Sequence, residues 1–165
     1  MTDTQATNMV GCYSGKPLNT QNIDSLAAEG IRFNSAYTCS PVCTPARGLF
    51  TGIYANQSGP WTNNVAPGKN ISTMGRYFKD AGYHTCYIGK WHLDGHDYFG
   101  TGECPPEWDA DYWFDGANYL SELTEKEISL WRNGLNSVED LQANHIDETF
   151  TWAHRISNRA VDFLQ

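Results

Sequence analysis

The sequence has no long uninterrupted run of apolar residues. No stretch of its 165 residues approaches the roughly 20 apolar positions that cross a bilayer, so it predicts no transmembrane segment and no membrane partner. It also shows no signal peptide with a basic start, an apolar centre and a small-residue cleavage site. We therefore expect a cytoplasmic protein, with the periplasm as the alternative if the true N-terminus is missing.

Cysteines and basic residues are too few, or wrongly spaced, for several common functions. The five cysteines form an odd set without a Cys-x-x-Cys pair, which argues against a disulfide framework and against a zinc site. The 11 Lys and Arg residues against 19 Asp and Glu residues give a net charge of −8, which argues against a nucleic-acid partner. A small anion stays acceptable as a ligand, because one local pair of cations can hold it.

The apolar residues that are present have the spacing of alternating helices and strands. Hydrophobic residues make up 40% of the chain and aromatic residues 13%, which is enough for one domain with a core. The expected helices lie at residues 21–29, 72–81, 121–133, 137–142 and 147–164, and the expected strands at 31–37 and 84–89. Thr20, Ser72 and Asp147 are the expected N-caps. This alternation predicts the α/β class.

The run Cys-Thr-Pro-Ala-Arg at residues 43–47 is typical of a loop that turns into a helix. Pro45 suits the first turn, because its missing N–H has no partner there and its φ is already helical. Cys43 then lies at the helix N-terminus, where backbone N–H groups favour an anion such as a thiolate, an alkoxide, or a bound sulfate or phosphate. Arg47, one turn later, can donate to the same anion. The alternative is a buried structural cysteine beside a proline turn.

Lys90 and His92 follow the second expected strand, in the run Gly-Lys-Trp-His at residues 89–92. If the strand conformation continues, their i, i+2 spacing places both side chains on one face. An ammonium and an imidazole side by side suit an oxyanion that leaves a nucleophile, whereas the alternative is an ordinary exposed strand end. The asparagine-rich loop at residues 53–70 could contact a substrate, or its side chains could bond their own backbone.

These two runs together resemble the signature motifs of the formylglycine-dependent sulfatases, a family of the alkaline phosphatase superfamily. The resemblance implies an alkaline-phosphatase-like sandwich, in which helices flank a central, mostly parallel sheet. It implies that a formylglycine-generating enzyme oxidises Cys43 to formylglycine, whose hydrate is both the nucleophile and a metal ligand. Arg47, Lys90 and His92 complete the expected catalytic set. Asp3 is the expected further metal ligand, with an ordinary surface aspartate as the alternative.

The implied activity is hydrolysis of a sulfate ester on a small aryl or sugar substrate. The implied cofactor is a divalent cation, with Ca²⁺ expected ahead of Mg²⁺ and Mn²⁺ because the ligands are hard oxygens. Aromatic and aspartate residues at 94–118 could line a sugar pocket, or they could only anchor a long loop. Two other functions stay open: a phosphonate monoester or phosphodiester hydrolase of the same superfamily, and a catalytically inactive fragment.

The resemblance departs from the family pattern in three respects. The family usually has one residue more between Arg47 and the apolar pair that follows it, and one residue fewer rotates the rest of a helix by about 100°. Thr4 stands where many relatives carry a second acidic ligand. Residues 1–165 resemble only the N-terminal part of a sulfatase catalytic domain, with a truncated first strand and no later ligands. We therefore expect a fragment that is inactive alone.

Overall fold

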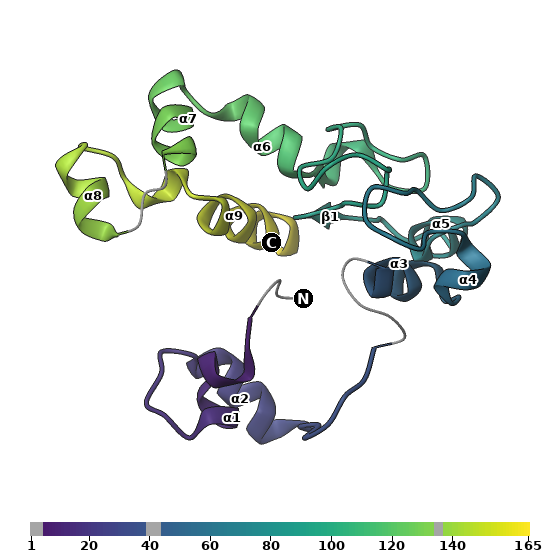
Figure 1. The fold of residues 1–165 in the computed structure, drawn as a ribbon, viewed down its shortest axis with the longest axis horizontal. Helices are drawn as coiled ribbons and strands as arrows, with labels where there is room; N and C mark the ends of the chain where they lie inside the picture. The colour runs from purple at the N-terminus through teal and green to yellow at the C-terminus, as the bar shows by residue number, and fades with distance from the viewer. Residues whose placement is uncertain (1–4, 39–43, 134–136) are drawn as a thin grey trace. The chain divides into compact units, whose positions relative to one another are not determined.

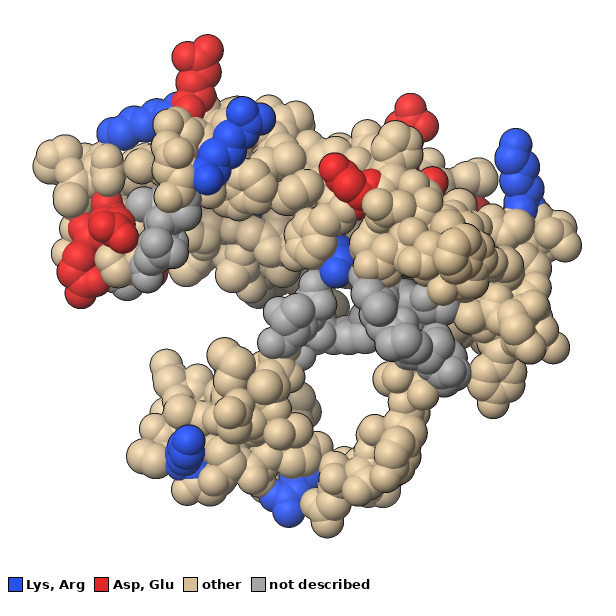
Figure 2. Space-filling view, in the orientation of Figure 1, with Lys and Arg blue, Asp and Glu red and all other residues tan. Residues whose placement is uncertain are grey.

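The computed structural model describes residues 5–38, 44–133 and 137–165. The chain divides into two compact units, Met1–Tyr37 and Thr38–Gln165, which are considered separately below. Among the described residues, no helix has both the length and the apolar character needed to cross a bilayer. Figure 2 shows acidic and basic side chains spread over the visible face, with a group of acidic side chains in the region of α8.

The N-terminal unit consists of short helices held together by one carboxylate. Its helices are η1 (Thr7–Met9), α1 (Gly11–Ser14) and α2 (Gln21–Glu29). Helix α2 confirms the helix expected at 21–29, but the Thr20 hydroxyl does not cap it. That hydroxyl instead accepts a hydrogen bond from the Gly11 N–H and donates one to Asp24. Asp24 also accepts from the Cys12 N–H at 2.7 Å, so this carboxylate joins α1 to α2.

The strand expected at residues 31–37 is wrong. The segment has no regular secondary structure, and Ile31, Phe33 and Tyr37 are exposed. A strand needs a neighbouring strand that pairs its backbone N–H and C=O groups, and no strand in the described part of the chain pairs with this segment. Alternating sequence pattern alone therefore did not produce a strand here.

Two short parallel strands form the sheet of the C-terminal unit. Strand β1 (Tyr87–Ile88) pairs with β2 (Trp113–Phe114), with Tyr87 opposite Trp113 and Ile88 opposite Phe114. The Gly89 N–H extends the pairing by donating to the Phe114 carbonyl at 2.9 Å. The strand expected at 84–89 is thus present but covers only two residues. The parallel pair agrees with the α/β class.

Helices lie on both sides of this small sheet. Those of the C-terminal unit are α3 (Thr44–Thr51), α4 (Ala55–Ser58), α5 (Met74–Asp80), η2 (Ala110–Tyr112), α6 (Gly116–Glu122), α7 (Glu125–Arg132), α8 (Val138–Ala143), η3 (Glu148–Phe150) and α9 (Trp152–Leu164). Figure 1 shows α3, α4 and α5 on one side of β1, and α6 to α9 on the other. The sheet therefore separates two helical regions of the same unit.

Capping residues decide where several of these helices begin. The helix expected at 121–133 is split, because Thr124 and Glu127 form a capping box that starts α7 afresh. Helix α5 begins after Thr73 rather than Ser72, and the Thr73 hydroxyl donates to Glu107 instead of capping the helix. Asp147 accepts from the Thr149 N–H and so caps the short helix η3, not α9. The expected helices thus exist, whereas three of their starts were misplaced.

The sheet also separates two hydrophobic clusters, because adjacent strand residues point to opposite faces. The first, here called the tryptophan cluster, consists of Trp91, Leu93, Trp108 and Trp113, with Phe50, Met74, Tyr87 and Cys104 packed against it. The second, here called the helical cluster, consists of Phe114, Tyr119, Leu123, Leu141 and Phe150. Trp113 and its neighbour Phe114 therefore belong to different cores.

Candidate functional site

Helix α3 begins at Thr44, directly after Cys43 in the sequence. Pro45 is accordingly in the first helical turn, as predicted from its fixed φ and missing N–H. Cys43 and Asp3 themselves lie outside the described residues, and so does the side chain of Arg47. Their predicted roles as nucleophile, metal ligand and anion-binding residue stay predictions.

Phe50 ties the second half of α3 to the tryptophan cluster. Its ring centroid lies 5.6 Å from that of Trp91 and 5.7 Å from that of Tyr87, in tilted or edge-on contacts. Leu49, the other member of the apolar pair after Arg47, is 56% exposed. Helix α3 is continuous over Thr44–Thr51. Only one of the two apolar residues is therefore available to anchor this helix.

The run Gly-Lys-Trp-His leaves strand β1 immediately. Gly89 has a φ of 132°, and His92 has a φ of 51°. Neither value belongs to an extended strand, so the expectation that Lys90 and His92 share one strand face is wrong. Two residues of pairing with β2 are too few to hold the segment extended, and Gly89 permits the turn because it lacks a Cβ.

Lys90 is held from two directions. Its ammonium nitrogen lies 4.4 Å from the centre of the Tyr98 ring, a cation–π contact. Its backbone carbonyl accepts a hydrogen bond from the Tyr87 hydroxyl. Burial, followed by the charge of Asp115, raises the pKa of Tyr87 far above its ordinary value, so this phenol stays a donor. Both the side chain and the backbone of Lys90 thus have a fixed position just after β1.

His92 is a buried side chain in an uncommon backbone conformation. It is 6% exposed, and its Nε2 lies 2.7 Å from the amide oxygen of Asn64. An amide oxygen only accepts, so this contact is a hydrogen bond in the tautomer that carries its hydrogen on Nε2. Asn64 has a φ of 60°, which places both partners in the left-handed region. Such residues are uncommon outside glycine and often mark functional sites.

Asn64 and Tyr98 were missed as specific site residues. Asn64 lies in the loop whose asparagines were expected to contact a substrate or their own backbone, yet it contacts the candidate catalytic histidine. The available signal was an asparagine in a glycine-rich loop, since Asn tolerates positive φ better than most residues. Tyr98 carried no signal beyond being one aromatic residue among several.

Aspartates of the segment at 94–118 mainly hold that segment in place. Asp94 accepts from the N–H groups of His96 and Thr101, both at 3.0 Å. Asp115 is fully buried, accepts from the Gly102 N–H at 2.9 Å, and forms the capping box of α6. These bonds support the loop-anchoring alternative for the aspartates. Within the described ranges, no three His, Cys, Asp or Glu side chains gather closely enough to hold a metal ion.

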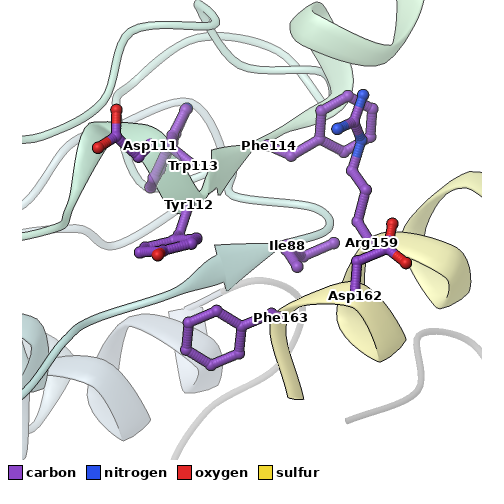
Figure 3. Close-up of a pocket in the computed structure, with 8 residues that line it drawn as sticks. All are labelled: Ile88, Asp111, Tyr112, Trp113, Phe114, Arg159, Asp162 and Phe163. Carbon is purple, nitrogen blue, oxygen red and sulfur yellow. The ribbon is translucent and has the colours of Figure 1, made fainter. Parts of the chain in front are cut away.

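A hollow of about 230 Å³ lies away from these residues, between the two strands and α9. Figure 3 shows Ile88 and Phe114 from the strands and Arg159, Asp162 and Phe163 from α9 around it. The Arg159 guanidinium lies 3.9 Å from the centre of the Phe114 ring and is also bonded to Glu122. Neither Lys90 nor His92 lines the hollow, so it is separate from these two residues of the candidate site.

Comparison with protein families decides the classification. The family model described as sulfatase matches residues 1–165. The chain belongs to the sulfatase family. The fold is accordingly the α/β fold of these enzymes, and two solved structures are similar to it. One, a protein in complex with its substrate D-glucosamine-2-N,6-O-disulfate, aligns with a TM-score of 0.55 and 33% identity over 66% of this chain and 21% of that one.

The second solved structure carries the sulfatase name and comes from Bacteroides fragilis. It aligns with a TM-score of 0.53 and 28% identity over 76% of this chain and 34% of that one. Among curated relatives, the uncharacterized sulfatase YidJ of Escherichia coli (strain K12) is 99% identical over 166 positions, 100% of this chain and 33% of the relative. The alignment is one position longer than the chain, so this relative has at least one residue without a counterpart here.

A sulfatase with a named substrate is more distant. The N-acetylglucosamine-6-O-sulfatase of Bacteroides thetaiotaomicron is 32% identical over 148 residues, 81% of this chain and 26% of that enzyme. The chain thus spans about a third or less of the length of these curated relatives. Membership of the family is established by these matches, whereas the activity of the whole protein is a separate question.

Proposed function

We propose that the complete protein containing this chain hydrolyses sulfate esters, with Cys43 converted to formylglycine as the nucleophile. The observation that carries the proposal is the fixed placement of Lys90 and His92 beside the tryptophan cluster. The same cluster holds Phe50 of α3, the helix that begins after Cys43. Membership of the sulfatase family supports this reading of the two motifs.

Lys90 and His92 have distinct roles in this proposal. The Lys90 ammonium stabilises negative charge on the sulfuryl oxygens during transfer. His92 exchanges a proton with the nucleophilic residue, so that sulfate can leave and the residue returns to its starting form. Arg47 donates to the same anion from one turn into α3. The overall reaction consumes one water and gives an alcohol and sulfate.

A divalent cation is part of the proposal, with Asp3 and modified Cys43 as its ligands in this chain. Both would offer hard oxygen donors, which suit Ca²⁺ first and Mg²⁺ or Mn²⁺ next. Bound there, the cation would favour an ionised oxygen on the nucleophile. Further ligands would come from parts of the protein outside these 165 residues.

A sulfated sugar is the substrate class that we favour. One relative is named for N-acetylglucosamine 6-O-sulfate, and one similar structure contains a disulfated glucosamine. Tyr98 is 44% exposed beside Lys90, which leaves ring surface on which a sugar could stack. A phosphonate monoester would present nearly the same shape, so activity measurements must separate the two.

The test uses the complete protein, produced together with a formylglycine-generating enzyme. Oxidation of Cys43 should lower the mass of its peptide by about 18 Da, since the thiol and one hydrogen are replaced by a carbonyl oxygen. An aryl sulfate and N-acetylglucosamine 6-sulfate should be cleaved faster than an aryl phosphonate. Cys43→Ala should abolish cleavage, whereas the matched variant Cys12→Ala should retain it. A modified, cation-loaded protein that cleaves neither sulfate would contradict the proposal.

A further inference from the structure

We propose that Asn64 is a positioning residue for His92. In this inference the Asn64 amide oxygen accepts a hydrogen bond from the Nε2–H of the imidazole, which fixes the orientation in which the ring exchanges a proton. The inference rests on the proposed function, because it assigns a purpose to His92 in catalysis. It adds a residue from the asparagine-rich loop to the set expected from the two motifs.

The contact between the two side chains is short and joins distant parts of the sequence. Nε2 and the amide oxygen are 2.7 Å apart, although the residues are 28 positions apart. His92 is almost fully buried, whereas Asn64 lies at the surface. The asparagine therefore covers a buried imidazole from the solvent side. Orientation of a functional imidazole by a bond to its second nitrogen is a recurring arrangement in proteins.

Left-handed backbone conformations and close backbone packing surround this contact. Asn64 and His92 both have left-handed φ values, 60° and 51°. Gly95 has a φ of 83°, and a Cβ there would lie 3.3 Å from the Ala66 nitrogen. The loop that carries Asn64 and the segment that follows His92 are thus packed backbone to backbone. A side chain at Gly95 would disturb this packing, since its φ already disfavours other residues.

The loop that carries Asn64 is itself anchored at both ends. Pro60 is fully buried, and Ser58 is 2% exposed. The Gly68 N–H donates to the Ser58 carbonyl at 3.1 Å, which closes the loop between these residues. Asn64 is therefore presented on a fixed turn. The structure gives the amide a defined place from which it can orient the imidazole.

A purely structural role for Asn64 makes different predictions from a positioning role. If the amide only stabilised the loop, its removal would lower the unfolding midpoint and leave the chemistry of the folded enzyme unchanged. If it orients His92, its removal lowers kcat while KM stays nearly constant, because the imidazole acts on proton exchange and not on substrate binding. The ring nitrogens of His92 would also change their NMR signals.

The decisive variant is Asn64→Gly in the complete, modified protein. Glycine accepts the left-handed backbone, so this change removes the amide without adding strain. We expect kcat on the aryl sulfate to fall about 10- to 100-fold, the usual cost of losing a partner that orients a functional imidazole. Asn64→Asp keeps an oxygen acceptor at the same position and should recover most of this loss. Asn70→Gly, in the same loop, is the matched control and should keep kcat.

Nitrogen-15 NMR of histidine-labelled protein gives a readout that does not depend on activity. His92→Gln identifies the signals of His92. We expect the parent to show Nε2 as the protonated nitrogen, and Asn64→Gly to shift those signals while Asn70→Gly leaves them unchanged. The inference is overturned if Asn64→Gly leaves both kcat and the His92 signals unchanged, or if Asn64→Asp recovers nothing. A parent that is inactive but shows the expected signals contradicts the proposed function and retains the Asn64–His92 bond.

Discussion

The two hydrophobic clusters on either side of β1 and β2 are built differently. In the tryptophan cluster, aromatic rings from both strands and from the segments between them pack edge to face, with ring centroids 4.8 Å apart for Tyr87 and Trp91 and 5.1 Å apart for Trp91 and Trp113. The helical cluster instead gathers side chains from α6, α8 and their neighbours. The segment that carries Lys90 and His92 also contributes Trp91 to the tryptophan cluster. Its geometry is therefore set by ring packing more than by regular hydrogen-bonded structure.

Both clusters also contain buried hydrogen-bond donors. The Tyr119 hydroxyl, in the helical cluster, donates to the Phe150 carbonyl at 3.0 Å. The indole N–H groups of Trp108 and Trp113 are buried, and the described part of the chain offers neither an acceptor. A buried donor without an acceptor costs about 1–3 kcal/mol. The tryptophan cluster thus contains two such donors in the described part of the chain, and the Nε of Arg159, which packs on Phe114 of the helical cluster, is a third.

The largest expected difference between the two clusters comes from replacing one large side chain of each cluster by alanine. Trp108→Ala should lower the free energy of unfolding by about 3–5 kcal/mol, because it removes a ring that contacts Phe50, Tyr87 and Trp91. It should also lower kcat about 10- to 100-fold in the folded protein, since small displacements of catalytic groups are costly. Urea unfolding and steady-state kinetics of the complete protein measure the two effects.

Leu141→Ala is the matched change in the helical cluster. It should cost about 2–5 kcal/mol of stability, by the same loss of buried apolar contacts. Its kcat should stay close to that of the parent, because Leu141 packs in the helical cluster, which includes neither Lys90 nor His92. Equal losses of kcat in the two variants would show that the clusters do not act separately.

A smaller change tests how tightly the tryptophan cluster is packed. A Cβ at Gly75 in α5 would lie 2.7 Å from the Trp108 ring. Gly75→Ala should therefore destabilise the protein by about 1–3 kcal/mol through overpacking, which exceeds the gain of about 1 kcal/mol from better helix propensity. A lower thermal unfolding midpoint than that of the parent indicates that overpacking dominates, and a higher one indicates that helix propensity dominates. A stabilised variant would mean that the ring can move aside.

The sequence predicted helices better than it predicted the sheet. Helix α2 and the last helix α9 follow from apolar spacing within one segment, and both are present. The strands β1 and β2 depend on each other across the 24 residues at 89–112, and a local pattern cannot show that pairing. Residues 31–37 show the converse case, because they have the pattern of a strand and no partner in the described structure.

The sequence motifs predicted which residues form the candidate site, but not how those residues are arranged. The motifs located Lys90 and His92, but the turn at Gly89 and the left-handed φ of His92 follow from contacts with distant loops. Asn64 could not be chosen among the asparagines of its loop from the sequence. Which of them reaches the imidazole depends on how the loop closes, and closure involves the buried residues Ser58 and Pro60.

The smallest expected effect on stability concerns two carboxylates that each accept a backbone hydrogen bond, one near each cluster. On the tryptophan side, the Thr85 N–H donates to Asp109 at 2.8 Å, and this bond, aided by Lys79, lowers the pKa of Asp109. On the helical side, the Thr124 N–H donates to Glu127 at 2.7 Å and lowers the pKa of Glu127. In both cases the folded protein favours the charged carboxylate.

A lowered folded-state pKa fixes the direction of the pH dependence. Stabilisation by Asp109 or Glu127 is present above the unfolded-state pKa, near 4, and is lost as the pH falls through the lower folded-state value. Asp109→Asn and Glu127→Gln should therefore destabilise the protein at pH 7, and each variant should approach the parent as the pH falls below the unfolded-state pKa and through the lower folded-state pKa. Urea unfolding at these pH values measures the convergence. If either difference stays constant with pH, that carboxylate acts through shape and not through its charge. Since Asp109 joins α5 to the start of the β1 segment, only its replacement should also alter kcat at pH 7.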